Sequence, residues 1–87
     1  MNNLKKIMVN PWDFTLYMCG NGDYIIKVMF SEGQYKVDVA RFFFLKNDEI
    51  GSIINMDELK IISETIRKNY SSYKDKELTK GQFDNLN

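Results

Sequence analysis

The fold follows from residues 12–30, which read WDFTLYMCGNGDYIIKVMF. On both sides of Gly20-Asn21-Gly22, apolar and polar side chains alternate with the period of two residues that is typical of half-buried strands. A three-residue loop at this glycine segment keeps the two apolar faces together, whereas a two-residue turn would reverse one of them. We therefore predict a hairpin in which Met18 pairs with Tyr24 and Gly22 adopts a left-handed backbone conformation.

A second hairpin is expected next, with a turn at 31–34 and a third strand over 35–45. The apolar residues of the two strands stay in phase if Phe30 pairs with Tyr35. Arg41 lies on this apolar face and interrupts it, so we expect either a bulge or a snorkelling side chain there.

The two ends of the chain are less regular. Leu4, Ile7 and Val9 either form a short edge strand or lie against the domain, and residues 50–54 are a candidate fourth strand that Gly51 weakens. A helix is expected from about Met56 to Tyr70, because Asn55 is a favourable N-cap and acidic residues follow it. Its apolar stripe is Leu59, Ile62, Ile66, Tyr70 and Tyr73.

These elements predict an α+β fold, a three- or four-stranded antiparallel meander sheet packed on one C-terminal helix. Residues 1–75 are expected to form one domain, and the polar segment 76–87 a loosely ordered tail.

The composition excludes several functional classes. The chain has 87 residues, and 12 basic side chains balance 12 acidic ones, so the basic footprint of a nucleic-acid-binding protein is absent. Its one cysteine, Cys19, cannot form an intramolecular disulfide, which favours a reducing compartment. No apolar run approaches the roughly 20 residues of a membrane span. The apolar run near the N-terminus is also too short for the apolar region of a signal peptide. We expect a cytoplasmic protein without membrane contact.

The residues for enzymatic chemistry are scarce. The chain has no histidine, which removes histidine-dependent nucleophile systems and the commonest metal ligand. Cys19 has no flanking base, and the glycines at 20–22 precede neither a lysine-serine pair nor a helix, so a hairpin turn explains them. Carboxylate pairs at 48–49 and 57–58 have the pattern of solvated turn and cap residues. We predict no enzymatic activity, no cofactor and no metal site.

The second face of the predicted sheet carries the most information. In the expected register Lys27 lies opposite Asp38 as an ion pair, and an apolar cluster follows along the same face. Such a cluster has three explanations: the chain covers it with residues 47–54, its N-terminal segment or its tail; another protein binds there; or it is a homodimer seam. The predicted partner-binding residues are Tyr17, Ile25, Lys27, Asp38, Phe42 and Phe44.

Residues 12–16 have the pattern Trp-x-Phe-x-Leu of a strand, residues 21–24 read Asn-Gly-Asp-Tyr at a turn, and the expected helix begins with Asp-Glu-Leu at 57–59 and ends with Lys-Asn-Tyr at 68–70. This layout of residues 12–73 resembles that of small bacterial toxin-immunity proteins. It implies a cytosolic, cofactor-free domain that blocks the active site of a toxin. A phage inhibitor of a host protein would have the same physical profile.

Two other functions compete with this one. A small nucleic-acid-binding module could stack bases on Tyr17, Phe42 and Phe44, although the neutral charge and nearby aspartates argue against it. An enzyme or small-molecule carrier would need a deep pocket between helix and sheet with convergent polar groups.

Overall fold

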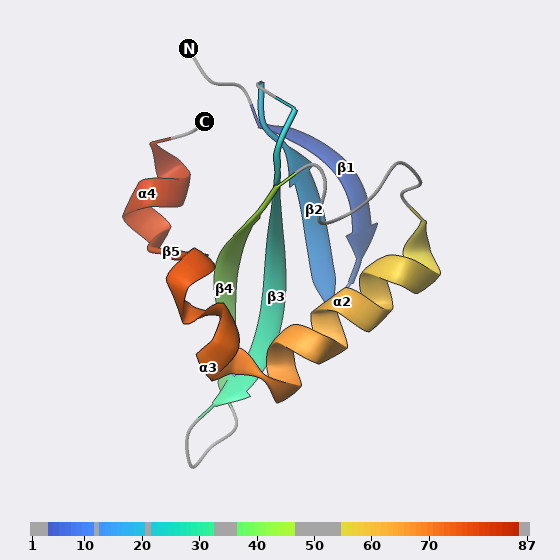
Figure 1. The fold of residues 1–87 in the computed structure, drawn as a ribbon, viewed down its shortest axis with the longest axis vertical. Coiled ribbons are helices and arrows are strands. Elements are labelled where there is room, and N and C mark those ends of the chain that lie inside the picture. Colours follow the sequence, from blue (N-terminus) through green and yellow to red (C-terminus); the bar gives the residue numbers. More distant parts are fainter. Residues whose placement is uncertain (1–3, 12, 21, 33–36, 47–54, 86–87) are drawn as a thin grey trace.

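The computed structural model describes residues 4–11, 13–20, 22–32, 37–46 and 55–85. They form a five-stranded antiparallel sheet with strands in sequence order, accompanied by helices from the C-terminal part of the chain (Figure 1). This confirms the predicted α+β class. The strands are β1 Lys5–Asn10, β2 Phe14–Met18, β3 Tyr24–Glu32, β4 Val37–Leu45 and β5 Glu77–Leu78. The helices are α2 Met56–Lys68, α3 Tyr70–Tyr73, the 3-10 helix Lys74–Lys76 and α4 Lys80–Asp84.

The central hairpin has the predicted register. Met18 of β2 pairs with Tyr24 of β3, so the two apolar faces coincide. The Cys19 N–H donates to the Asp23 carbonyl oxygen at 2.7 Å and closes the loop. Gly22 has φ +94°, the left-handed conformation that glycine adopts without steric cost.

The register of the second hairpin differs from the prediction. Phe30 pairs with Val39, not with Tyr35, so β4 is shifted by four residues along β3. Because four is an even number, every side chain keeps its predicted face, and hydrophobic alternation cannot distinguish the two registers. The observed one places Phe43 opposite Ile26 in the core. Tyr35 itself lies outside the described residues.

One face of the sheet packs against α2 (Figure 1). The helix begins as predicted: the Asn55 side chain accepts from the Glu58 N–H at 2.8 Å, and Leu59 and Ile66 are fully buried. It ends at Lys68, before the predicted end at Tyr70, and α3 follows after Asn69. The main core consists of Phe14, Leu16, Ile26, Val28, Phe43, Leu45, Leu59 and Ile66.

Arg41 lies on this face, as predicted. The pairing of β3 with β4 is continuous through Arg41, so the strand has no bulge there. Its guanidinium lies 4.9 Å from the centre of the Tyr70 ring, and Nη1 donates to Glu77 Oε2 at 2.9 Å. The Tyr70 hydroxyl donates to the other oxygen of Glu77 at 2.5 Å. The predicted interruption of the core is therefore an ionic contact that holds β5 and α3 together.

Residues 77–85 form regular structure that contacts the sheet, contrary to the loose tail predicted for 76–87. β5 pairs with Phe42 and Phe43 of β4, and the Thr79 hydroxyl and the Gln82 side chain form a capping box that starts α4. Phe83 from α4 is 7% exposed and packs on the second face of the sheet. The domain therefore extends at least to Asp84, because the apolar contacts of Phe83 hold α4 against the sheet.

The N-terminal segment takes the first of its two predicted alternatives and forms edge strand β1. Its pairing with β2 is shifted between Lys6 and Met8, which marks a bulge at Ile7. The candidate strand at 50–54 lies outside the described residues.

Truncation of Phe83 tests whether α4 belongs to the folded unit. We expect Phe83→Ala to lower the free energy of unfolding by about 3 kcal/mol, because it removes a buried aromatic ring from a small core. Urea denaturation measures the loss. Ile61→Ala is the matched control, since Ile61 is 59% exposed and its truncation should change stability by less than about 0.5 kcal/mol. Equal values for both variants would contradict a structural role for α4.

Candidate protein-binding surface

The second sheet face has a covered end and an open end. At the covered end, near the Gly20–Gly22 turn, Phe83 stacks on Phe42 with ring centres 4.1 Å apart and meets the Tyr17 ring edge-on at 5.1 Å. Ile25 beneath them is fully buried. The apolar side chains predicted for this face therefore form a second, small core with Phe83.

This packing revises the predicted partner-binding cluster. Tyr17, Ile25, Phe42 and Phe44 do share the face that α2 does not touch, as predicted, because their pairing partners lie in one register. Ile25 and Phe42 are buried, however, so the expected exposed apolar cluster is wrong for these two residues. Of the three expected explanations, coverage by the chain itself applies to these two residues, and Phe83 of the C-terminal tail provides it.

The predicted ion pair is also wrong. Lys27 lies opposite Phe42, whereas Asp38 lies opposite Ser31 and accepts a hydrogen bond from its hydroxyl at 3.2 Å. The cause is the four-residue shift of β4, which moves Asp38 toward the far end of the sheet. Lys27 therefore remains without an ion-pair partner among the described residues.

The open end of the second face contains a hollow of 280 Å³ beside β1, which we call the β1 hollow. It is lined mainly by Val9, Pro11, Thr15, Lys27 and Met29. Thr15 is 5% exposed, while Val9 stands 44% exposed at the rim. The β1 hollow is thus an apolar depression with one cationic side chain at its edge.

Strand β1 borders the β1 hollow and forms the edge of the described sheet. Lys5, Lys6, Ile7 and Val9 are all exposed. An edge strand offers unpaired backbone groups, and exposed aliphatic side chains on it are unusual, because edges are normally protected against pairing. Sequence reasoning noted Ile7 and Val9 but missed the hollow, since its walls come from three strands.

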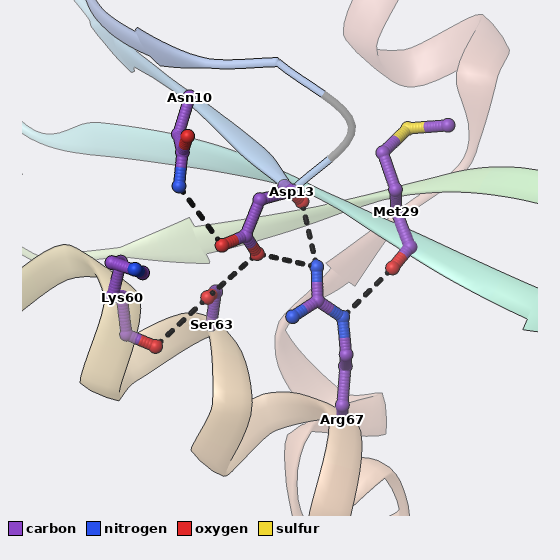
Figure 2. A network of polar contacts seen from close by, with 6 residues as sticks. All are labelled: Asn10, Asp13, Met29, Lys60, Ser63 and Arg67. Atoms are coloured by element: carbon purple, nitrogen blue, oxygen red, sulfur yellow. Dashed lines mark hydrogen bonds and ion pairs between the residues drawn. The ribbon is translucent and has the colours of Figure 1, made fainter.

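A polar cluster that includes the Met29 carbonyl oxygen fastens α2 to the sheet (Figure 2). Arg67 Nη2 donates to the Asp13 carboxylate at 2.5 Å and to the Asp13 carbonyl oxygen at 2.8 Å. Its Nε donates to the Met29 carbonyl oxygen at 2.8 Å. We call this arrangement the Asp13–Arg67 clasp.

Two further side chains complete the coordination of Asp13 in Figure 2. Asn10 Nδ2 donates to one carboxylate oxygen at 3.0 Å, and the Ser63 hydroxyl lies 3.1 Å from the other and 2.9 Å from the Lys60 carbonyl oxygen. Ser63 is fully buried in the interior side of α2. The carboxylate thus serves the β1–β2 turn and the helix at once.

An open groove of 570 Å³ adjoins the clasp, with Asp13, Asp38 and Arg67 among its lining residues. The Asp13 carboxylate accepts from Arg67 and Asn10, and the Arg67 guanidinium also donates to the Asp13 and Met29 carbonyl oxygens. These polar groups of the groove are therefore used in contacts that hold the fold together.

Cys19 is half-buried at the end of the covered face. Burial raises the pKa of its thiol, and the nearby negative charge of Asp23 raises this pKa further. Burial also raises the pKa of the Tyr17 phenol. A raised thiol pKa reduces the thiolate fraction, which supports a structural role for Cys19.

Within the described ranges, no three acidic or cysteine side chains are grouped so that they could hold a metal ion. None of the helices in the described part of the chain is long and apolar enough to cross a membrane. Comparison of the chain with protein-family models, curated proteins and solved structures finds no match in any of the three.

Substitution of Arg67 tests the Asp13–Arg67 clasp. Arg67→Lys keeps the charge but cannot reproduce the fork that reaches both the Asp13 and Met29 carbonyl oxygens. We expect a loss of about 2 kcal/mol in the free energy of unfolding, measured by urea denaturation. The neighbouring exposed Lys68 provides the control, and Lys68→Met should cost less than about 0.5 kcal/mol. If Arg67→Lys lowers the free energy of unfolding no more than Lys68→Met does, the clasp does not help to hold α2 on the sheet.

Alkylation of Cys19 tests its environment. Because the thiol pKa is raised in the folded protein, we expect iodoacetamide to react more slowly at pH 8 than with the urea-unfolded chain. The pH at which the rate reaches half its maximum should be higher for the folded protein. A lower midpoint would indicate an activated thiol.

Proposed function

We propose that this protein is a non-enzymatic, cytoplasmic inhibitor that binds another protein, in the manner of small bacterial toxin-immunity proteins. The observation that carries the proposal is the apolar depression beside an open sheet edge, with Ile7 37% and Val9 44% exposed. The partner is a toxin or, for a phage-encoded protein, a host enzyme.

The burial pattern supports this position of the binding surface. Phe83 covers the apolar side chains near the Gly20–Gly22 turn, and two of the large apolar side chains that remain exposed, Ile7 and Val9, lie on β1. The other two among the described residues, Met56 and Ile61, lie on α2. An apolar patch surrounded by polar side chains is typical of protein-binding surfaces. The predicted surface around Phe42 and Phe44 is thereby replaced, within the same sheet face, by one around Val9 and Lys27.

The use of polar residues supports an inhibitor over an enzyme. The Asp13 carboxylate accepts from Asn10 and Arg67, and the Arg67 guanidinium also donates to two backbone carbonyl oxygens in the clasp. An inhibitor needs a rigid surface and no reactive group, and a helix fastened to the sheet by these partly buried polar contacts meets that need.

The alternative of a nucleic-acid-binding module is weakened at one of its three predicted stacking residues. Phe83 stacks on Phe42 and so occupies a face of that ring, while Tyr17, which meets Phe83 edge-on, and Phe44 are half-buried. A filter-binding titration against single-stranded DNA and RNA at low salt is expected to show no affinity.

Competition between sibling cells tests the inhibitor proposal. We expect source cells that lack this gene to be killed or outgrown in mixed culture with the parental strain, because they no longer neutralise the delivered toxin. The wild-type gene should restore survival. The Ile61→Asp variant should restore it as well, since Ile61 lies on the exposed side of α2 and far in sequence from the β1 edge. Equal survival of deletion and parental strains would contradict an immunity function.

A further inference from the structure

The outer edge of β1 is open among the described residues, because the sheet order begins with this strand. Two features protect such edges from indiscriminate pairing, a bulge and charged side chains. Strand β1 has a bulge at Ile7 and two lysines, but it has no acidic residue. Its protection is therefore selective, since it repels basic segments and attracts acidic ones.

The β1 hollow supplies a place for a side chain next to this edge. A strand that adds to a sheet alternates its side chains between the two faces, and specificity arises where one of them enters a pocket. The hollow opens on the second face between Val9 at the rim and Met29, with Thr15 at its floor. Its walls are mainly apolar and fit an aliphatic or aromatic side chain.

Among the described residues, Lys27 is the charged side chain that lines the β1 hollow, and Lys6 projects from the same face of β1. Lys6 pairs with Tyr17, and Lys27 pairs with Thr15, so both lysines project from the second face. Neither has an ion-pair partner among the described residues. Asp13 is engaged in the clasp, and Asp38, which shares the second face, lies opposite Ser31, two residues beyond Met29, and accepts a hydrogen bond from the Ser31 hydroxyl. The acidic residues of the first turn of α2 belong to the helix on the opposite face.

We infer that an extended acidic segment of the partner protein adds to the sheet alongside β1, with an apolar side chain in the β1 hollow and carboxylates beside Lys6 and Lys27. This inference rests on the proposed function, because it specifies how the proposed partner binds. Main-chain hydrogen bonds to β1 provide affinity, and the hollow and the lysines select the sequence.

A second copy of the chain is a poorer occupant of the same edge. Each β1 contributes Lys5 and Lys6 and no carboxylate, so pairing of two β1 strands would bring four lysines into one short ladder. Like charges on neighbouring strands destabilise a sheet. The charge distribution therefore favours an acidic partner over a homodimer.

The probe is a blocked peptide of about eight residues, long enough for one strand, in which glutamate alternates with valine and leucine. We expect NMR titration to shift the amide signals of β1 and of the residues around the β1 hollow, and to protect β1 amides from hydrogen exchange. The control peptide carries lysine in place of every glutamate and should leave these signals unchanged. Equal binding of both peptides, or shifts centred on α2, would overturn the inference.

Three variants of the chain sharpen the test. Val9→Asp and Lys6→Glu should each weaken binding of the acidic peptide about tenfold or more, since both side chains are exposed and their replacement leaves the core intact. Lys60→Glu removes the same positive charge from the exposed side of α2 and should leave affinity unchanged. A loss in all three variants would indicate nonspecific charge attraction and contradict the inference.

Two readouts separate this inference from the proposed function. If Val9→Asp and Lys6→Glu restore survival in the mixed culture as well as the wild type does, the inhibitor proposal stands and the β1 site is wrong. If the acidic peptide binds at β1 while deletion of the gene has no effect on survival, the site stands without the immunity function. Sedimentation of the purified protein as a dimer that Val9→Asp dissociates would assign the edge to a second copy and overturn the inference.

Discussion

The β2–β3 hairpin carries apolar side chains on both of its faces, and this determines how the rest of the chain packs against it. Near the Gly20–Gly22 turn, the apolar side chains of both strands point to both faces, for example Leu16 and Ile26 to one and Tyr17 and Ile25 to the other. A sheet that is apolar on both faces needs a cover on each. α2 covers one face, and the short helix α4, with Phe83, covers part of the other. The chain thus completes a three-layer arrangement at one end of a small sheet.

Local rules predict the parts of this fold that depend on neighbouring residues. The register of the central hairpin follows from the position of Gly22 and the phase of the flanking apolar residues, and the start of α2 follows from Asn55. The pairing of β3 with β4 does not follow, because a four-residue shift leaves every side chain on its face. What decides it is the fit of large side chains such as Phe43 in the core, which alternation does not encode.

The same distinction explains what sequence reasoning found and missed in the candidate site. Tyr17 and Phe42 are on the predicted face, yet their exposure depends on Phe83, whose contact with them spans more than forty residues of chain. The polar appearance of 76–87 concealed one buried ring and the Glu77 contact with Arg41. Lys27 lies on the predicted second face, but its cross-strand neighbour is Phe42 instead of Asp38, and it lines the β1 hollow.

The described polar residues differ in how fully they are bonded. The Arg67 guanidinium donates to the Asp13 carboxylate and to the carbonyl oxygens of Asp13 and Met29, so the clasp fastens α2 to the sheet. On the second face, Lys6 and Lys27 have no ion-pair partner among the described residues, and Val9 is 44% exposed. For the proposed binding at β1, a helix already fastened to the sheet would lower the ordering cost, and the two lysines would supply charge for an acidic segment. This difference between bonded and unbonded polar groups is the physical argument for proposing recognition at β1 and not at the clasp.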